Sequence, residues 1–135
     1  MVIADLKRYF LADGLKVHWN FKLLPKGFEA ITLFGHIYDV RSKSDLLRFL
    51  ETDRGRVMVN HERIHMLQAK SFKCGYLTFY ILYIWYWIKG LFKYGTKNNV
   101  AYYNIPFERE AYVCELDFNY NKSLWKDYIE DPQGA

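Results

Sequence analysis

Between Lys73 and Lys89 the chain carries a charge-free segment, residues 74–88, that is rich in tyrosine and tryptophan. A straight helix needs about 20 apolar residues to span a bilayer, and this segment has only 15. Its aromatic residues also differ from the aliphatic centre of a spanning helix. Two alternatives remain for residues 76–88: a central helix buried by the protein itself, or an interfacial helix in peripheral contact with a membrane or a partner. We expect the buried helix, because a helix without a polar face must be covered in a soluble monomer.

The size and composition of the chain indicate a folded protein with one core. The chain has 135 residues, of which 51% are hydrophobic and 19% aromatic, whereas disordered chains are poor in such residues. Aromatic side chains bury large areas, so a core of sufficient size is within reach of a chain this short. The length predicts a single domain over residues 1–135.

The charge balance and the cysteines argue against several classes of protein. The net charge is +4, but no run of five or six basic residues occurs, so we do not expect a nucleic-acid partner. Cys74 and Cys114 lie far apart without C-x-x-C spacing, which predicts two reduced thiols in the core rather than a disulfide or a cysteine-type zinc site. Lys7 and Arg8 lie near the start of the chain, before any apolar run of signal-peptide length, which predicts no secretory signal. We therefore expect a cytoplasmic protein. Membrane association is the alternative if residues 76–88 are interfacial.

Turn signals, caps and apolar spacing predict an α+β fold that is mainly helical, with a short β element. Residues 28–41 are rich in β-branched and aromatic residues around Gly35, which predicts one or two strands with a bulge or tight turn. Ser44 and Asp53 are the expected caps of the two helices that follow. Helices are expected over residues 3–11, 44–51, 53–70, 76–88, 106–118 and 123–130.

The sequence His61-Glu62-Arg63-Ile64-His65 has the form H-E-x-x-H. On a helix, residues four apart lie on one face, so His61 and His65 can bind the same metal ion. Catalytic zinc takes three protein ligands and leaves a fourth position for water. The spacing therefore predicts a Zn²⁺ site in which Glu62 is the general base that takes the proton of a zinc-bound water.

Glu108 is the expected third ligand. It follows Pro106, whose fixed φ suits the first turn of a helix, and a carboxylate from a second helix completes many zinc sites with two histidines. Glu110 is the alternative, since the sequence does not determine which face of that helix meets the histidines. Residues two apart on a helix point to opposite sides, so the two carboxylates cannot both be ligands.

The segments NHERIHMLQ and IPFEREAY resemble the gluzincin clan of zinc metallopeptidases, and more closely a group of small bacterial H-E-x-x-H proteins. The resemblance covers about residues 28–117 and implies a minimal zincin-like domain. It implies that His61, His65 and Glu108 are the metal ligands and Glu62 the general base. It also implies an edge strand before the metal helix that an extended peptide could join. Tyr112 stands where many members have an aspartate that accepts an imidazole N–H, so a backbone carbonyl, Tyr112 or Glu115 would have to replace it.

The function expected from these residues is zinc-dependent hydrolysis of a peptide or protein substrate. The oxyanion that forms needs a hydrogen-bond donor, for which Tyr102, Tyr103 and Arg109 are the candidates. Asn60 and Gln68 flank the motif and are expected on a solvated helix face, with contact to a substrate or to a metal ligand as the alternative. The alternatives are a non-catalytic metal-binding protein with a vestigial zincin site, and a membrane-associated or partner-associated protein that uses residues 76–88.

Overall fold

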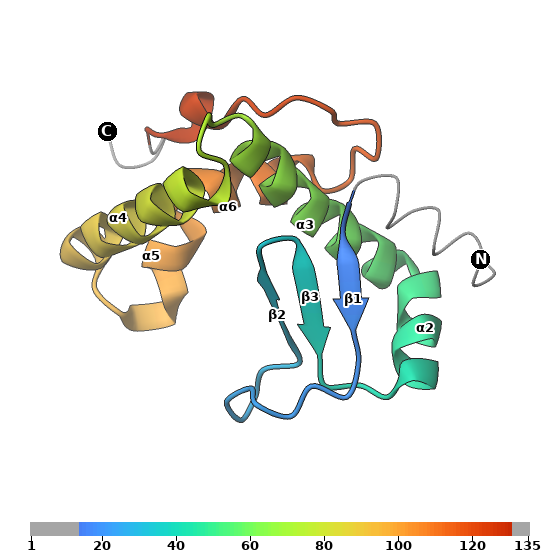
Figure 1. Cartoon of the computed structure of the whole chain (residues 1–135). Helices are drawn as coiled ribbons and strands as arrows, with labels where there is room; N and C mark the ends of the chain where they lie inside the picture. Colours follow the sequence, from blue (N-terminus) through green and yellow to red (C-terminus); the bar gives the residue numbers. More distant parts are fainter. Residues whose placement is uncertain (1–13, 131–135) are drawn as a thin grey trace. The chain divides into compact units, whose positions relative to one another are not determined.

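The computed structural model describes residues 14–130, so the helix expected over residues 3–11 lies outside the described part. Within that part a small mixed sheet of three strands is followed by five helices (Figure 1), which confirms the mainly helical α+β class. The chain divides into two compact units, one up to Arg63 and one from Ile64 onward. The expectation of a single domain over residues 1–135 stays a prediction.

The sheet of the first unit consists of β1 (Lys16–His18), β2 (Ala30–Leu33) and β3 (His36–Asp39) in the order β1-β3-β2. β2 and β3 pair antiparallel with Ile31 opposite Tyr38, and β1 pairs parallel to β3. Phe34 and Gly35 both have positive φ and form the tight turn between β2 and β3. The predicted strands with a turn at Gly35 are thus confirmed. β1 was not predicted, because residues 15–24 alternate only loosely and the strand itself has just three residues.

Two helices follow the sheet, α2 (Lys43–Glu51) and α3 (Asp53–Lys70). Ser42, and not the predicted Ser44, caps α2, because the Ser42 hydroxyl accepts the backbone N–H of Asp45. The helix predicted over residues 53–70 is confirmed as α3. At its start the Thr52 hydroxyl accepts the N–H of Gly55, so Thr52 takes the capping role that we expected of Asp53.

Gly55 lies where the start of α3 passes closest to the end of α2. A Cβ at this position would overlap the carbonyl oxygen of Phe49 and would lie 2.7 Å from the Cα of Leu50. The Phe49 carbonyl belongs to the backbone and cannot turn away as a side chain could. The close approach of the two helices therefore requires glycine here.

The helices of the second unit are α4 (Tyr76–Tyr94), α5 (Val100–Tyr103) and α6 (Pro106–Cys114), with short 3-10 turns η1 (Lys97–Asn99) and η2 (Trp125–Tyr128). α4 continues past Gly90, where we expected it to end, because Gly90 lacks the Cβ that would press on Ala101 of α5. α6 begins at Pro106 as predicted but ends at Cys114 rather than at residue 118. Both cysteines are free, although Cys74 is exposed rather than in the core.

An aromatic cluster forms the core of the second unit, with Phe107 of α6 at its centre. The Phe107 ring lies 4.8 Å from both Phe79 of α4 and Trp125 of η2, measured between ring centroids. All three side chains are buried. Aromatic pairs at such distances add about 0.5–1.5 kcal/mol each beyond the area that they bury. The cluster therefore holds α6 in a fixed position against α4 and the C-terminal segment.

The exposure of the outer face of α4 contradicts the prediction that this helix is buried. Residues 76–88 form a helix as predicted, but that helix is not buried by the protein itself: Ile81, Ile84 and Trp85 are all more than half exposed, and Leu77 is 65% exposed. The composition of the segment gave no polar side by which the buried and exposed faces could be told apart. Among the described residues, none of the helices combines the length and the apolar character that crossing a membrane requires.

We expect Gly55→Ala to lower the free energy of unfolding, although a glycine-to-alanine change inside a helix usually stabilises by about 0.5–1 kcal/mol. The added methyl group must displace the backbone at Phe49, and overpacking of this kind costs about 1–3 kcal/mol. Urea unfolding followed by circular dichroism measures the change. Arg54→Ala, at the exposed preceding position, is the matched control and should leave stability within about 0.5 kcal/mol. An unchanged or higher stability of Gly55→Ala would contradict this account of the helix junction.

Candidate metal centre

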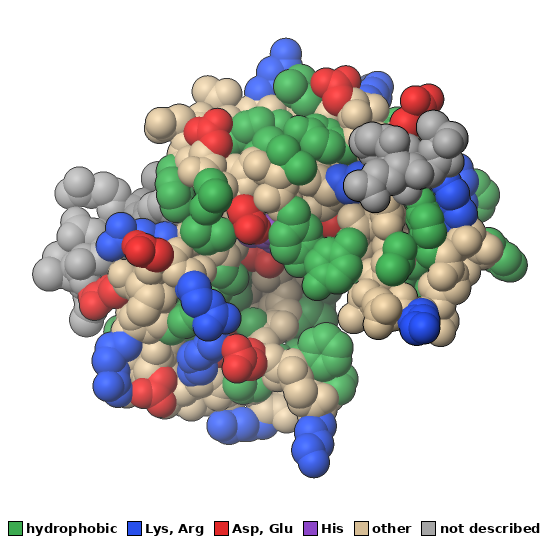
Figure 2. All heavy atoms as spheres, turned by 180° about the vertical axis from the view of Figure 1, so that it is seen from behind, with side chains coloured by type: hydrophobic (Ala, Val, Ile, Leu, Met, Phe, Trp, Pro, Cys, Tyr) green, Lys and Arg blue, Asp and Glu red, His purple; other side chains and the backbone are tan. Residues whose placement is uncertain are grey.

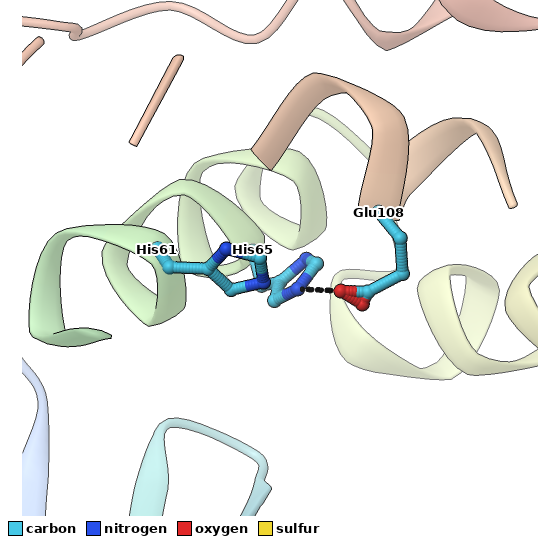
Figure 3. A group of neighbouring side chains, drawn as sticks. All are labelled: His61, His65 and Glu108. Atoms are coloured by element: carbon cyan, nitrogen blue, oxygen red, sulfur yellow. Dashed lines mark hydrogen bonds and ion pairs between the residues drawn. The ribbon is translucent and has the colours of Figure 1, made fainter. Parts of the chain in front are cut away.

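The helix α3 brings His61 and His65 to the same side, one turn apart. Both residues lie within its 18-residue span, so the geometry of the helix alone sets their relative position. His61 is buried and His65 is half-buried, while Ile64 between them is completely buried. The burial of Ile64 orients this part of α3 and leaves the two imidazoles side by side (Figure 3).

Glu108 comes from the first turn of α6. Pro106 begins the helix, and the buried ring of Phe107 fixes its rotation, so that the Glu108 side chain meets α3. Its Oε1 lies 2.8 Å from Nε2 of His65 (Figure 3), and the Tyr83 hydroxyl donates to its Oε2 at 3.4 Å. Glu108 is only 2% exposed. A carboxylate this buried requires a cation or several donors to offset its lost hydration.

His61, His65 and Glu108 together could hold a metal ion. One ligand atom from each residue lies within 4.8 Å of the other two. Two imidazole nitrogens and one carboxylate oxygen are a donor set that occurs in zinc sites with an open position. A divalent cation would also offset the charge of the buried Glu108 carboxylate. Both the geometry and the chemistry of the three residues therefore fit a metal ion.

Gln68 holds the imidazole of His65 in one orientation. Its Nε2 donates to the carbonyl of Phe107 and to Oε1 of Glu110, each at 2.8 Å. With both amide protons used in this way, Oε1 of Gln68 faces Nδ1 of His65 at 2.8 Å and accepts a hydrogen bond from its N–H. With Nδ1 turned to Gln68, Nε2 is the ring nitrogen that faces Glu108, and it is the atom that would bind a metal ion.

Glu110 is buried on the same helix as Glu108, but its surroundings differ. Its oxygens accept hydrogen bonds from Gln68 Nε2, the Ser123 hydroxyl, the Tyr120 hydroxyl and the backbone N–H of Leu124. Four donors satisfy a carboxylate. Glu110 thus joins α6 to the C-terminal segment, and Glu108 is the carboxylate that the structure brings to the histidines.

The remaining residues of the motif region also lie mostly inside. Glu62 is half-buried and follows His61 directly on α3. Asn60 and Gln68 are completely buried, so the expectation of a solvated helix face is wrong for both. Asn60 Oδ1 accepts from Nε of Arg63 at 3.0 Å. Because these residues are polar, we expected them to face solvent. In the structure each one instead makes a hydrogen bond to a buried group.

The three candidate oxyanion donors differ in their surroundings. The guanidinium of Arg109 donates to Oδ1 of Asn104 and to the carbonyl of Tyr128, which ties α6 to neighbouring loops. Tyr103 is exposed. Burial raises the pKa of Tyr102, and the charge of Glu108 raises it further, so its phenol keeps its proton at neutral pH. Tyr102 is therefore a protonated hydroxyl close enough to Glu108 to sense its charge.

Tyr83 was not predicted to take part, and Gln68 was expected on a solvated helix face rather than in the contact with substrate or with a metal ligand that its position beside the motif also allowed. Tyr83 lies in the aromatic segment, where it was one tyrosine among many. Gln68 lies three residues after His65, a spacing that places both on neighbouring positions of a helix. That spacing was the sequence signal for a contact between Gln68 and His65. The general preference of glutamine for the surface outweighed it.

No protein-family model, curated protein or solved structure matches this chain. The resemblance to the gluzincin clan therefore depends on the motif and on the geometry of His61, His65 and Glu108.

We expect Glu110→Ala to be strongly destabilising, because it leaves one buried and three part-buried donors without their acceptor. The loss should be about 3 kcal/mol or more. Ser123→Ala removes one of these donors and should cost only about 1 kcal/mol. Urea unfolding of both variants, with the exposed Glu130→Ala as a control, measures the difference. Equal stabilities of Glu110→Ala and the Glu130→Ala control would show that Glu110 does not hold this segment.

Proposed function

We propose that this protein is a zinc-dependent peptidase with His61, His65 and Glu108 as the metal ligands. The observation that supports this most is the meeting of the H-E-x-x-H histidines with a buried carboxylate from another helix. Glu108 is 43 positions from His65 in the chain, yet their side chains are in contact. A surface helix with two solvated histidines would not require such a partner.

When bound, a zinc ion polarises a substrate carbonyl and lowers the pKa of a coordinated water. The protein supplies the proton acceptor: Glu62, next to His61 on α3, takes the proton of the attacking water and delivers it to the departing amine. Tyr102, whose phenol stays protonated at neutral pH, is the proposed donor to the oxyanion. Arg109 is not assigned this role, because its guanidinium donates to Asn104 and Tyr128.

Gln68 takes the part that the gluzincin resemblance gives to an aspartate at the position of Tyr112. Its amide oxygen accepts from Nδ1 of His65, and partners of this kind fix the tautomer and direction of a ligating imidazole. The departure at Tyr112 therefore does not leave His65 without an acceptor. The three replacements expected from the sequence, a backbone carbonyl, Tyr112 and Glu115, are not needed for this imidazole.

The proposed reaction predicts different outcomes for two substitutions. Glu62→Gln should keep zinc but lower peptide hydrolysis by about 10² to 10⁴, because glutamine cannot take the proton of water. His65→Ala should lose the metal itself. Elemental analysis of protein purified without chelator, together with cleavage of a peptide library, measures both effects, and the exposed Glu51→Gln is the control. Turnover by Glu62→Gln at the parent rate would exclude Glu62 as the base. Zinc binding without any cleavage by the parent protein would favour the non-catalytic metal-binding alternative.

Gln68→Ala should weaken zinc binding by about 10 to 100-fold, because the orientation of His65 is lost. The substitution also removes hydrogen bonds to α6, so a control that loses a hydrogen bond to α6 but leaves His65 untouched is needed. Ser123→Ala removes a donor to Glu110 without touching His65 and should bind zinc as the parent does. Competition with a chromophoric chelator measures the affinities. Parental affinity in a folded Gln68→Ala protein would overturn the positioning role.

A further inference from the structure

The exposed side chains of α4 form a continuous apolar stripe, defined by Leu77, Ile81, Ile84, Trp85, Ile88 and Phe92. Their spacings of three and four residues place them on one face of the helix. Ile81 is 60% exposed and Phe92 is 89% exposed. Scattered apolar residues on a surface are ordinary, but a stripe along the whole length of a helix marks an interaction surface.

The opposite face of α4 is already occupied by the core of its own unit. Phe79 and Tyr83 pack on Phe107, and Gly90 approaches Ala101 closely. α4 cannot turn its stripe inward without removing these residues from the core. The apolar stripe is therefore a fixed outward feature of the second unit.

The charges on α4 and in the residues that flank it are all of one sign. α4 contains no aspartate or glutamate, and it carries Lys89 and Lys93 in its last part. Lys73 precedes the helix and Lys97 follows it. The ammonium of Lys89 lies within 6 Å of the rings of Trp85 and Tyr86, and that of Lys93 lies 5.2 Å from the Tyr94 ring. Figure 2 shows hydrophobic side chains at the surface of the protein among basic and acidic ones.

We propose that α4 docks on the surface of an anionic lipid bilayer, with its axis along the membrane plane and the stripe in the acyl boundary. Trp85 and Trp87 have the amphipathic rings that favour the headgroup level. The lysine stems allow the ammonium groups to reach lipid phosphates while the apolar side chains are buried. Helix length and composition rule out a span within the described residues, so the contact is peripheral.

The same charges argue against a second copy of the chain as the occupant. A symmetric pairing of two stripes would bring lysines of both copies together with no acidic residue of α4 to neutralise them. An anionic surface supplies that neutralisation, at about 1 kcal/mol for each lysine near the membrane. The proposal concerns a face of α4 other than the one that carries Tyr83, and it does not depend on the proposed peptidase activity.

Sedimentation of the full chain with lipid vesicles tests the proposal. We expect binding to vesicles of phosphatidylcholine mixed with phosphatidylglycerol, weaker binding to phosphatidylcholine alone, and a blue shift of tryptophan emission on binding. The double substitution Ile81→Ser and Phe92→Ser should lower the partition coefficient by about tenfold or more. Lys89→Gln with Lys93→Gln should lower it about tenfold on mixed vesicles only.

Leu116→Ser with Val113→Ser is the matched control, since both residues are exposed and apolar but lie outside α4. This variant should bind vesicles as the parent does. Circular dichroism and thermal unfolding check that every variant is folded. Absence of vesicle binding by the folded parent would overturn the proposal. So would equal binding by the stripe variant, or a concentration-dependent dimer that the stripe substitutions abolish while vesicle binding is absent.

Discussion

The buried amide of Gln68 connects the parts of the second unit on which the candidate metal centre depends. Its two N–H groups donate to the Phe107 carbonyl and to Glu110, both on α6, and its oxygen accepts from His65 on α3. The two contacts with α6 fix the register of α3 against α6. Because an amide has a fixed plane, they also set the direction in which the Gln68 oxygen meets the imidazole of His65. A slide of one helix along the other would break the two hydrogen bonds from Gln68 to α6 and separate His65 from Glu108. The geometry of the site is therefore part of the packing of the unit.

Glu108 and Glu110 show how one helix gives two identical side chains different roles. Both are buried, and Phe107 beside them is held by the aromatic core. Glu110 accepts hydrogen bonds from Gln68 and from the segment that contains Tyr120 and Ser123. These bonds offset the lost hydration of its carboxylate without an ion. Glu108 meets an imidazole and a phenol. A cation is the natural partner for such a carboxylate among nitrogen ligands, which is why the proposed site lies on this side of α6.

The sequence predicted the elements that local patterns specify and missed those that tertiary contacts decide. Helix α3 and the start of α6 follow from apolar spacing and from Pro106, and the turn at Gly35 follows from the need for positive φ. These signals also brought His61, His65 and Glu108 together correctly as neighbours. The choice between Glu108 and Glu110 depended on the rotation of α6, which the packing of Phe107 determines. The continuation of α4 through Gly90 depended on the approach of Ala101, and no local pattern carries that information.

The burial expected for residues 76–88 failed for a reason that bears on function. A helix that is apolar on every side gives no sign of which face meets the core, and covering it completely requires packed elements all around. In the second unit, α5 and α6 supply contacts to one face only, where Phe79 and Gly90 lie. Stability of the unit alone would permit polar residues on the other face, as on most surface helices. That face instead carries leucine, isoleucine, tryptophan and phenylalanine, and the helix has lysines but no acidic residue. Docking on the surface of an anionic bilayer would require this combination of residues.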